Sequence, residues 1–438
     1  MAESRAVTRR RTASPLVSAF LALASSHVVR TLAGFVFWVL VARLSPAVEV
    51  GVAGAVVATV TLLSRFTSLG LGSFLMAELP RLEAAPARRL VRVGTGAVVA
   101  VTTPVALLWC GAALLLDPGA GSSAGAAVAS LAVAVLLVAT TVATTVTSVW
   151  DYAALGLRRP GAQLTRNLVA AFGRFPLLLA WSLLGDVDAA AILTCWFVPL
   201  LASGLVLAVQ VRLAQGRRSA ADSSRDLLLA HWRTSLGHWL LDVALAAGPL
   251  LVPVVAAAAL APRENAFFTM AWMAASVVFV APFALATSLF ADAAQHGPDA
   301  FAARCRRVLP VGLGLVLAGC VGTWVVGPLF FRVFGEEYVD ASLPVMSVLV
   351  LGGFWMVVKD LLLDWYRLGR RFALATGVAL TATVLDVAGA LVGGFVLGDG
   401  RGVAVGWVGA SALQLLLASP LVLGFVRRML AARPEADR

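Results

Sequence analysis

Long apolar runs dominate this chain and constrain its fold more than any other feature. Backbone polar groups inside lipid are satisfied only in helices or closed barrels, and long runs favour helices. Twelve runs are each long enough to cross roughly 30 Å of hydrocarbon. We therefore predict an all-α polytopic membrane protein with twelve transmembrane helices, near residues 16–42, 49–78, 90–116, 124–150, 162–184, 189–211, 229–260, 265–291, 308–331, 341–363, 373–397 and 402–426.

Composition agrees with a chain whose partner is the lipid bilayer. Hydrophobic residues make up 60% of the 438 residues and charged residues 13%, against about 25% charged in soluble proteins. The net charge of +11 lies in short clusters between apolar runs, as topology signals do, which argues against a nucleic-acid partner. The four cysteines show neither a disulfide pattern nor metal-ligand spacing. We expect no resident cofactor or metal.

Arginine is distributed unequally over the two sides of the predicted membrane. If the N-terminus is inside, the inside segments hold 25 arginines and the outside loops hold four, namely Arg43, Arg263, Arg332 and Arg401. The positive-inside rule then places both termini in the cytoplasm, in a multi-pass protein of the cell (plasma) membrane. The run at 16–42 is too long for the apolar part of a signal peptide, so we expect it to be the first membrane helix.

A polar phrase occurs twice, half a chain apart. "DYAALGLRRP" begins at Asp151 and "DWYRLGRRF" begins at Asp364, and other segments match at a similar distance, such as "ARRLVRV" at Ala87 and "ARCRRVL" at Ala303. We predict two six-helix repeats, over residues 1–215 and 216–438, related by an axis along the membrane normal, with substrate bound between them. The phrase itself is interpreted as a helix end whose arginines anchor at the headgroups.

Five charged residues lie near the middle of predicted helices, where a charge costs roughly 2.5–3.5 kcal/mol unless it faces a cavity or a partner. They are Arg30, Arg65, Arg174, Asp242 and Asp386. Helical spacing places other polar residues on the same faces, including His27 with Arg30, Ser64 and Ser68 with Arg65, and His238 with Asp242. These faces predict a water-filled cavity. The alternative is structural pairing, of Arg174 with Asp386 and of Asp242 with His238.

Several segments of the first 80 residues carry a family resemblance. An apolar run ending "VARLSP", then "EVGVAGAV", then "SLGLGSFLMAELPR" resembles the polysaccharide and oligosaccharide-lipid flippases (Wzx-type) of the multidrug/oligosaccharidyl-lipid/polysaccharide (MOP) superfamily. The chain departs from that pattern at Val50, where the family usually has an aromatic residue, and by one extra residue between Pro46 and Gly51.

The resemblance implies a transporter rather than an enzyme. Its expected substrate is a polyprenyl-pyrophosphate-linked oligosaccharide, moved from the cytoplasmic to the outer leaflet by alternating access for surface polysaccharide biosynthesis. Guanidinium groups bind phosphate oxygens in bidentate fashion and stay charged when desolvated. The expected substrate contacts are therefore Arg30, Arg65 and Arg174, with His27, Ser64 and Ser68. Other membrane proteins of polysaccharide assembly are possible partners.

Energy coupling is expected to use an ion gradient, because the chain has no Walker-type phosphate loop for ATP. Asp242 and Asp386 lie at matching depth, and the resemblance to lipid II flippases, which carry a sodium site on helices 7, 11 and 12, adds Ser411 and Gln414 as oxygen ligands. The coupling ion is then Na⁺ held at Asp242 and Asp386, or H⁺ relayed through His238.

Three other functions are compatible with twelve apolar helices. A MATE-like drug/cation antiporter would also use a buried Asp but has less need of arginines at the midplane. A major facilitator transporter usually carries a Gly–Asp–Arg–Gly–Arg type motif after helix 2, where this chain has "MAELPRLEAAPARR". A membrane glycosyltransferase or ligase needs a longer outside loop with acidic or histidine chemistry. The sequence does not identify the sugar.

Overall fold

The structure, a computed structural model, describes residues 31–157, 159–213, 239, 243, 247–296 and 298–431. These residues form helices joined by short turns, and they contain no strand. Ten of their helices are long and apolar enough to cross a membrane, and two shorter apolar helices, Thr31–Leu44 and Ala247–Ala259, stand at the positions of the first and seventh predicted spans. The predicted all-α polytopic fold is confirmed, and the ten long helices together with the two shorter ones agree with twelve spans.

The first half of the chain contributes six of these spans, which we call the first lobe. The second span is broken between two helices at Leu69 and Gly70, both of which have positive φ. The fifth span is likewise divided at Gly173. The elements are Thr31–Leu44, α2 (Ala47–Thr67), α3 (Leu71–Glu78), the short 3₁₀ helix η1 (Leu79–Arg81), α4 (Ala84–Leu116), α5 (Ser123–Ala129), α6 (Leu131–Gly156), α7 (Pro160–Phe172), α8 (Arg174–Leu184) and α9 (Ala189–Leu213).

The second half contributes the other six spans, which we call the second lobe. Its tenth span is a long continuous apolar segment made of two helices that follow each other almost directly. The elements are Ala247–Ala259, α11 (Pro262–His296), α12 (Pro298–Val325), α13 (Gly327–Arg332), α14 (Glu336–Leu349), α15 (Gly352–Leu368), α16 (Phe372–Leu397), α17 (Gly400–Leu417) and α18 (Ser419–Ala431).

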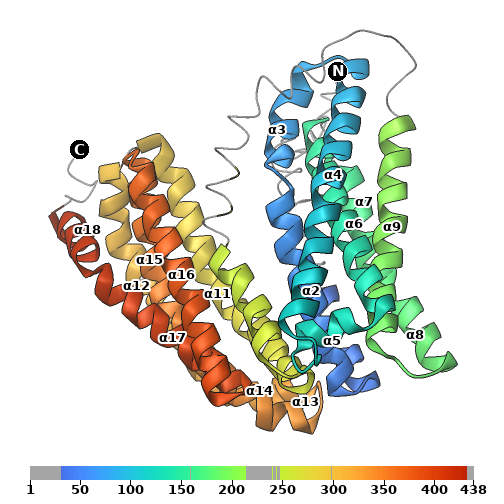
Figure 1. Cartoon of the computed structure of the whole chain (residues 1–438). Helices are drawn as coiled ribbons and strands as arrows, with labels where there is room; N and C mark the ends of the chain where they lie inside the picture. The colour runs from blue at the N-terminus through green and yellow to red at the C-terminus, as the bar shows by residue number, and fades with distance from the viewer. Residues whose placement is uncertain are drawn as a thin grey trace, which may run out of the picture.

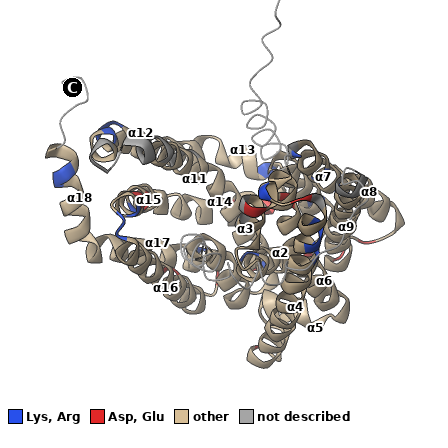
Figure 2. Cartoon of the chain, turned by 90° about the horizontal axis from the view of Figure 1, so that it is seen from above, with Lys and Arg blue, Asp and Glu red and all other residues tan. Residues whose placement is uncertain are grey.

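The two lobes lie side by side, meet at one end and diverge toward the other (Figure 1). We call the end where α2, α5, α11 and α13 come together the closed end, and the end that carries α3 and α18 the open end. Seen from the open end, Lys and Arg are present on helices of both lobes (Figure 2). The boundary predicted between residues 215 and 216 lies outside the described residues.

The repeated phrase ends a helix in both lobes, as predicted: α6 ends at Gly156 and α15 at Leu368. The closing hydrogen bonds correspond, with the amide of Arg159 donating to the carbonyl of Ala154 (2.8 Å) and that of Arg371 to Tyr366 (2.9 Å). These pairs are 212 residues apart (371 − 159), whereas the two phrases align at 213 (364 − 151). Asp151 therefore lies five residues before the end of α6 (156 − 151), whereas Asp364 lies four residues before the end of α15 (368 − 364).

One residue of helix corresponds to about 100° around the axis, so the two aspartates face different surroundings. In the first lobe, both carboxylate oxygens of Asp151 accept hydrogen bonds from the guanidinium of Arg166 on α7, one of them at 2.6 Å from Nε. Both side chains are buried. In the second lobe, Asp364 pairs with Arg367 on its own helix and lines a cavity.

The α16–α17 hairpin is packed through glycine. Four glycines face one another across the two helices, and a Cβ atom added to any of them would lie 1.9 to 2.3 Å from a backbone carbonyl oxygen of the other helix. Small residues spaced four apart allow membrane helices to approach until their backbones touch. The four are Gly389 and Gly393 on α16, and Gly402 and Gly406 on α17.

Candidate substrate cavity

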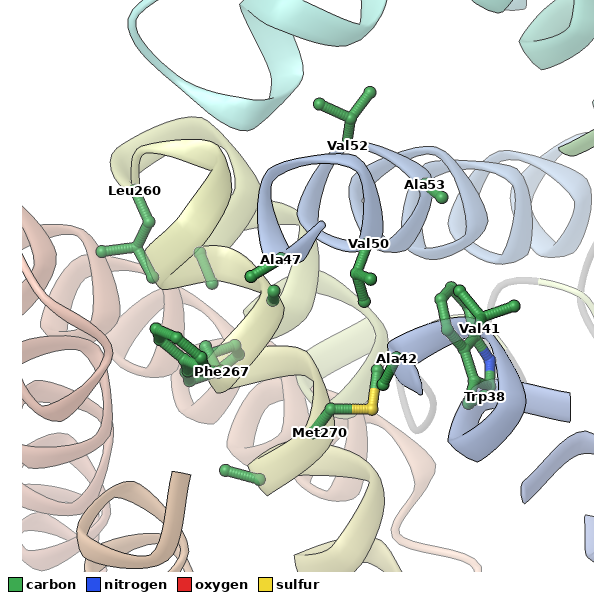
Figure 3. Close-up of a cluster of buried hydrophobic side chains, with 14 of the residues drawn as sticks. Trp38, Val41, Ala42, Ala47, Val50, Val52, Ala53, Leu260, Phe267 and Met270 are labelled. Carbon is green, nitrogen blue, oxygen red and sulfur yellow. The ribbon is translucent and has the colours of Figure 1, made fainter. Parts of the chain in front are cut away.

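The lobes are joined at the closed end by α2 and α11. A Cβ atom on Gly51 would lie 1.6 Å from the carbonyl oxygen of Pro262, so only glycine permits this approach. The buried amide of Asn265 donates a hydrogen bond to the Gly51 carbonyl at 2.8 Å. Around this contact, apolar side chains of α2 and of the helix before it face Phe267 and Met270 of α11 (Figure 3).

Two further contacts cross between the lobes at the closed end. Arg43 donates from Nε to the carbonyl of Val333 at 2.7 Å and from Nη2 to that of Arg332 at 2.5 Å. Ser123, at the start of α5, donates from its amide (2.9 Å) and its hydroxyl (3.1 Å) to the carbonyl of Leu260. Polar contacts and apolar packing together shut the space between the lobes at this end.

Toward the open end, two adjoining pockets form one cavity between the lobes. The first has a volume of about 540 Å³ and is lined mainly by α2, α3, α6 and the start of the helix Ala247–Ala259. The second has a volume of about 360 Å³ and is lined mainly by α11, α15 and α16. Arg65, Pro249 and Phe283 line both pockets.

Arg65 stands in the last turn of α2, directly before the break in the second span. Ser64 and Ser68 line the same cavity, so the structure brings these three predicted residues together. The two hydroxyls donate to carbonyls of their own helix, Ser64 to Thr61 (3.2 Å) and Ser68 to Arg65 (2.9 Å). Irregular backbone at membrane depth is tolerated where it lines a water-filled cavity, and the α2–α3 break does so.

The second lobe faces Arg65 with a charged stripe that the sequence reasoning missed. Lys359, Asp360, Asp364 and Arg367 all lie on α15 and line the same pocket as Arg65. Nη1 of Arg367 is 3.0 Å from Oδ1 of Asp364. The spacing of residues 360, 364 and 367 is that of a single helix face, so the signal was present. It was overlooked because the Asp364 phrase was interpreted as a headgroup anchor.

Asp386, a predicted coupling residue, lies beside the cavity wall in contact with Gln414, another predicted one. Nε2 of Gln414 donates to Oδ1 of Asp386 at 2.7 Å, while Nε1 of Trp355 donates to Oε1 of Gln414 at 2.5 Å. The indole N–H is only a donor, which fixes which end of the amide faces Asp386. Gln414 thus turns its N–H₂ toward the carboxylate, unlike the oxygen ligand expected for a sodium site. Ser411 is buried one turn earlier on α17.

Arg174, the third predicted cavity arginine in the first lobe, is placed differently. It begins α8 and is buried, with its guanidinium carbon 3.5 Å from the ring centre of Trp196 and 5.8 Å from that of Phe37. It is not among the residues that line the two pockets. Stacking on aromatic faces provides a partner for a buried guanidinium. The aromatic side chains that surround Arg174 could not be located from the sequence.

The remaining predicted site residues, His27, Arg30, His238 and Asp242, lie outside the described residues. Among the residues that the structure does describe, no three His, Cys, Asp or Glu side chains are grouped as metal ligands. The described part of the cavity therefore offers cationic, carboxylate and hydroxyl groups toward a solute.

Solved structures with the same fold cover nearly the whole chain. An inward-facing multidrug resistance MATE family transporter of the MOP superfamily matches with a TM-score of 0.64 and 14% identity, over 93% of this chain and 99% of that one. The lipid II flippase MurJ in an inward closed conformation matches with a TM-score of 0.68 and 11% identity, over 95% and 91%. A MOP superfamily transporter from Pyrococcus furiosus matches with a TM-score of 0.56 and 14% identity, over 96% and 95%.

Sequence comparison identifies the family. No protein matches in a comparison with curated sequences. Residues 16–245, more than half of the chain, match the family described as "Polysaccharide biosynthesis protein". The matched region contains the whole first lobe, including the broken second span and Arg65. The chain therefore belongs to the polysaccharide biosynthesis protein family and has the fold of the MOP superfamily transporters.

Proposed function

We propose that this protein flips a polyprenyl-pyrophosphate-linked oligosaccharide from the cytoplasmic to the outer leaflet. The family match supports a role in polysaccharide biosynthesis, and the fold, which a lipid II flippase shares, supports transport. A lipid-linked sugar has an apolar tail that stays in the bilayer and a polar headgroup that must cross it. A cavity between two lobes provides the aqueous path for the headgroup.

Arg65 is the observation that carries the proposal. It is a permanently charged group in the wall of a cavity between membrane helices, beside a break that exposes backbone to that cavity. A guanidinium matches phosphate oxygens with two parallel hydrogen bonds, which an ammonium does not. We assign Arg65 to the pyrophosphate, together with Arg30, and expect His27, Ser64 and Ser68 to contact the rest of the headgroup.

The test is complementation of a deletion strain. Arg65→Ala is expected to abolish surface polysaccharide and to cause lipid-linked intermediates to accumulate, with normal protein in the membrane. Arg65→Lys should restore only part of the activity, since the bidentate geometry is lost. Arg401→Ala is the matched control, because Arg401 is exposed and lies at the start of α17, away from the cavity. Full export by Arg65→Ala would refute the assignment.

The orientation follows from the arginines at the helix ends. We assign the open end to the cytoplasm, so that this conformation would load substrate from the inner leaflet, and place the protein in the plasma membrane. Reporter fusions at Gly119, at the closed end, and at Gly369, in the turn after α15, are expected to report outside and inside respectively. The same side for both fusions would contradict the topology.

For energy coupling we propose Asp386 with Asp242, and His238, Ser411 and Gln414 as the groups around them. The hydrogen bond from Gln414 to Asp386 supports this assignment, because it holds the Asp386 carboxylate in a defined position. Because Gln414 presents N–H₂ there, we favour a proton over Na⁺ at Asp386. Transport in vesicles with an imposed pH gradient or sodium gradient distinguishes the two. Unchanged ion dependence in Asp386→Asn would remove this residue from the coupling.

The second candidate function is a MATE-like antiporter of cationic compounds. The carboxylates Asp360 and Asp364 in the cavity favour it, since they would bind a cation. Expression in a strain sensitive to cationic dyes separates the two functions. An antiporter raises dye tolerance and depends on Asp364 but not on Arg65, whereas a flippase leaves tolerance unchanged.

A further inference from the structure

The charged stripe on α15 has no role in the flippase function proposed above, yet it lines the same pocket as Arg65. The pocket is lined by three cations, Arg65 from the first lobe and Lys359 and Arg367 from the second, and by two carboxylates, Asp360 and Asp364. Charges in membrane helices are retained where they face a cavity or pair with one another. All five residues face the cavity, Arg367 and Asp364 also pair with each other, and Arg65 comes from the opposite lobe.

Arg367 is held in two ways. Its Nη1 lies 3.0 Å from Oδ1 of Asp364, one turn earlier on α15. Its guanidinium carbon lies 4.6 Å from the ring centre of Phe290 on α11. In this pair the Arg367 side chain is 26% exposed and the Asp364 side chain 12%, so Arg367 is the partner that a solute in the pocket can reach. A diphosphate carries more negative charge and more acceptor oxygens than one carboxylate, so it can compete with Asp364 for Arg367.

Lys359 lies two turns before Arg367 and is half-buried in the same pocket. The side chain is close enough to Asp386 on α16 to interact with it electrostatically. Carboxylates of the second lobe thus accompany both cations of α15: Asp364 pairs with Arg367, and Asp360 and Asp386 lie near Lys359. All three cations line one pocket of about 360 Å³, so the oxygens of a diphosphate in that pocket would lie among them.

We propose that α15 supplies the second half of the headgroup site: Lys359 and Arg367 bind the diphosphate together with Arg65, and Asp364 occupies Arg367 until the diphosphate arrives. The inference rests on the proposed function and extends it to the second lobe. It predicts preference for a lipid diphosphate over a monophosphate, because the second phosphate adds charge and acceptor oxygens for cations that come from both lobes. A diphosphate bridging α2 and α15 would also draw the lobes together at the open end.

Replacing Asp364 should change anion binding in opposite directions, depending on whether this residue competes with the ligand or only stabilises the helix. If Asp364 only stabilises the helix, Asp364→Asn and Arg367→Gln should harm binding alike. If it competes with the ligand, Asp364→Asn frees Arg367 and strengthens anion binding, while Arg367→Gln weakens it. Hydrogen bonds between charged groups contribute about 1.5–3 kcal/mol each, so loss of one cation corresponds to about a tenfold change or more in Kd.

The experiment measures binding to the full-length protein in lipid nanodiscs by microscale thermophoresis. The probes are farnesyl diphosphate, farnesyl phosphate and farnesol, which share one tail. Lys359→Gln and Arg367→Gln are each expected to weaken diphosphate binding about tenfold and to leave farnesol binding unchanged. Asp364→Asn is expected to tighten diphosphate binding. Arg370→Gln is the matched control, because Arg370 is exposed at the end of α15, outside the pocket.

The outcomes separate the inference from the function on which it rests. If Arg65→Gln weakens diphosphate binding while Lys359→Gln and Arg367→Gln do not, the second-lobe site is wrong and the flippase proposal stands. If the wild-type protein does not distinguish farnesyl diphosphate from farnesol, both are wrong. Weaker binding by Asp364→Asn overturns the competitor role. Thermal unfolding checks each variant, and Lys359→Gln carries the test of the second-lobe site if Arg367→Gln fails to fold.

Discussion

Substitution of Gly51 by alanine should shift the conformational equilibrium of the protein. The new Cβ would lie 1.6 Å from the Pro262 carbonyl oxygen, whereas non-bonded atoms settle at about 3.5 Å. The two helices would have to separate by about 2 Å at this point. That separation breaks the 2.8 Å hydrogen bond from Asn265 to the Gly51 carbonyl. Leaving a buried amide without its partner costs about 1–3 kcal/mol.

Alanine also favours the helix by about 1 kcal/mol over glycine, but this gain applies to every conformation in which α2 is helical. The contact at the closed end is formed only when the lobes meet there. A penalty of about 2 kcal/mol therefore lowers the population of the state with the closed-end contact by about 30-fold, relative to a state in which the lobes part. Alternating access requires both states, so Gly51→Ala should also slow transport.

The distance between spin labels across the closed end measures this shift. Labels at Val48 on α2 and Arg263 on α11, both exposed, should give one short distance in the parent protein and an added longer distance in Gly51→Ala. Gly111→Ala is the matched control, because it makes the same change in helix α4 with no atom within 4 Å of the new Cβ. An unchanged distance distribution in Gly51→Ala would refute the argument that this glycine sets the closed state.

Three further predictions concern stability. Gly393→Leu should destabilise the second lobe and lower the thermal unfolding temperature, whereas Gly377→Leu, with no atom within 4 Å of its Cβ position, should not. Asp151→Asn should cost about 3–5 kcal/mol, because it leaves a buried arginine without its charge partner; a chemical denaturation series measures this, and a loss below about 1 kcal/mol would mean that Arg166 reaches water. Gln414→Leu should cost about 1–3 kcal/mol by removing hydrogen bonds to two side chains, and an unchanged unfolding temperature would contradict the network.

The sequence allowed prediction of what depends on local pattern. Hydropathy located the ten helices of spanning length and the two shorter apolar helices, and helical spacing placed Arg65 on one face with Ser64 and Ser68. Features that depend on a neighbouring helix were missed. The amide orientation of Gln414 is set by Trp355 of α15, and Arg174 stacks on Trp196 of α9. No periodicity within one helix carries that information.

The repeated phrase shows a subtler limit. Matching letters aligned Asp151 with Asp364, but the helix ends correspond one residue away from that alignment, and this difference sends one aspartate to Arg166 and leaves the other in the cavity. Sequence identity between internal repeats therefore did not imply an equivalent environment. The hydrogen bonds that close each helix were needed to see it.

The glycine contacts between α16 and α17 bear on the mechanics of transport. Where two backbones touch, there are no intervening side chains whose rotamers could change to let the helices slide. The hairpin should therefore move as one body, and the hydrogen bond between Asp386 and Gln414, which joins its two arms, should persist throughout the cycle. A change of ion occupancy at Asp386 would then move the whole hairpin against the neighbouring helices, rather than cause a local rearrangement within it.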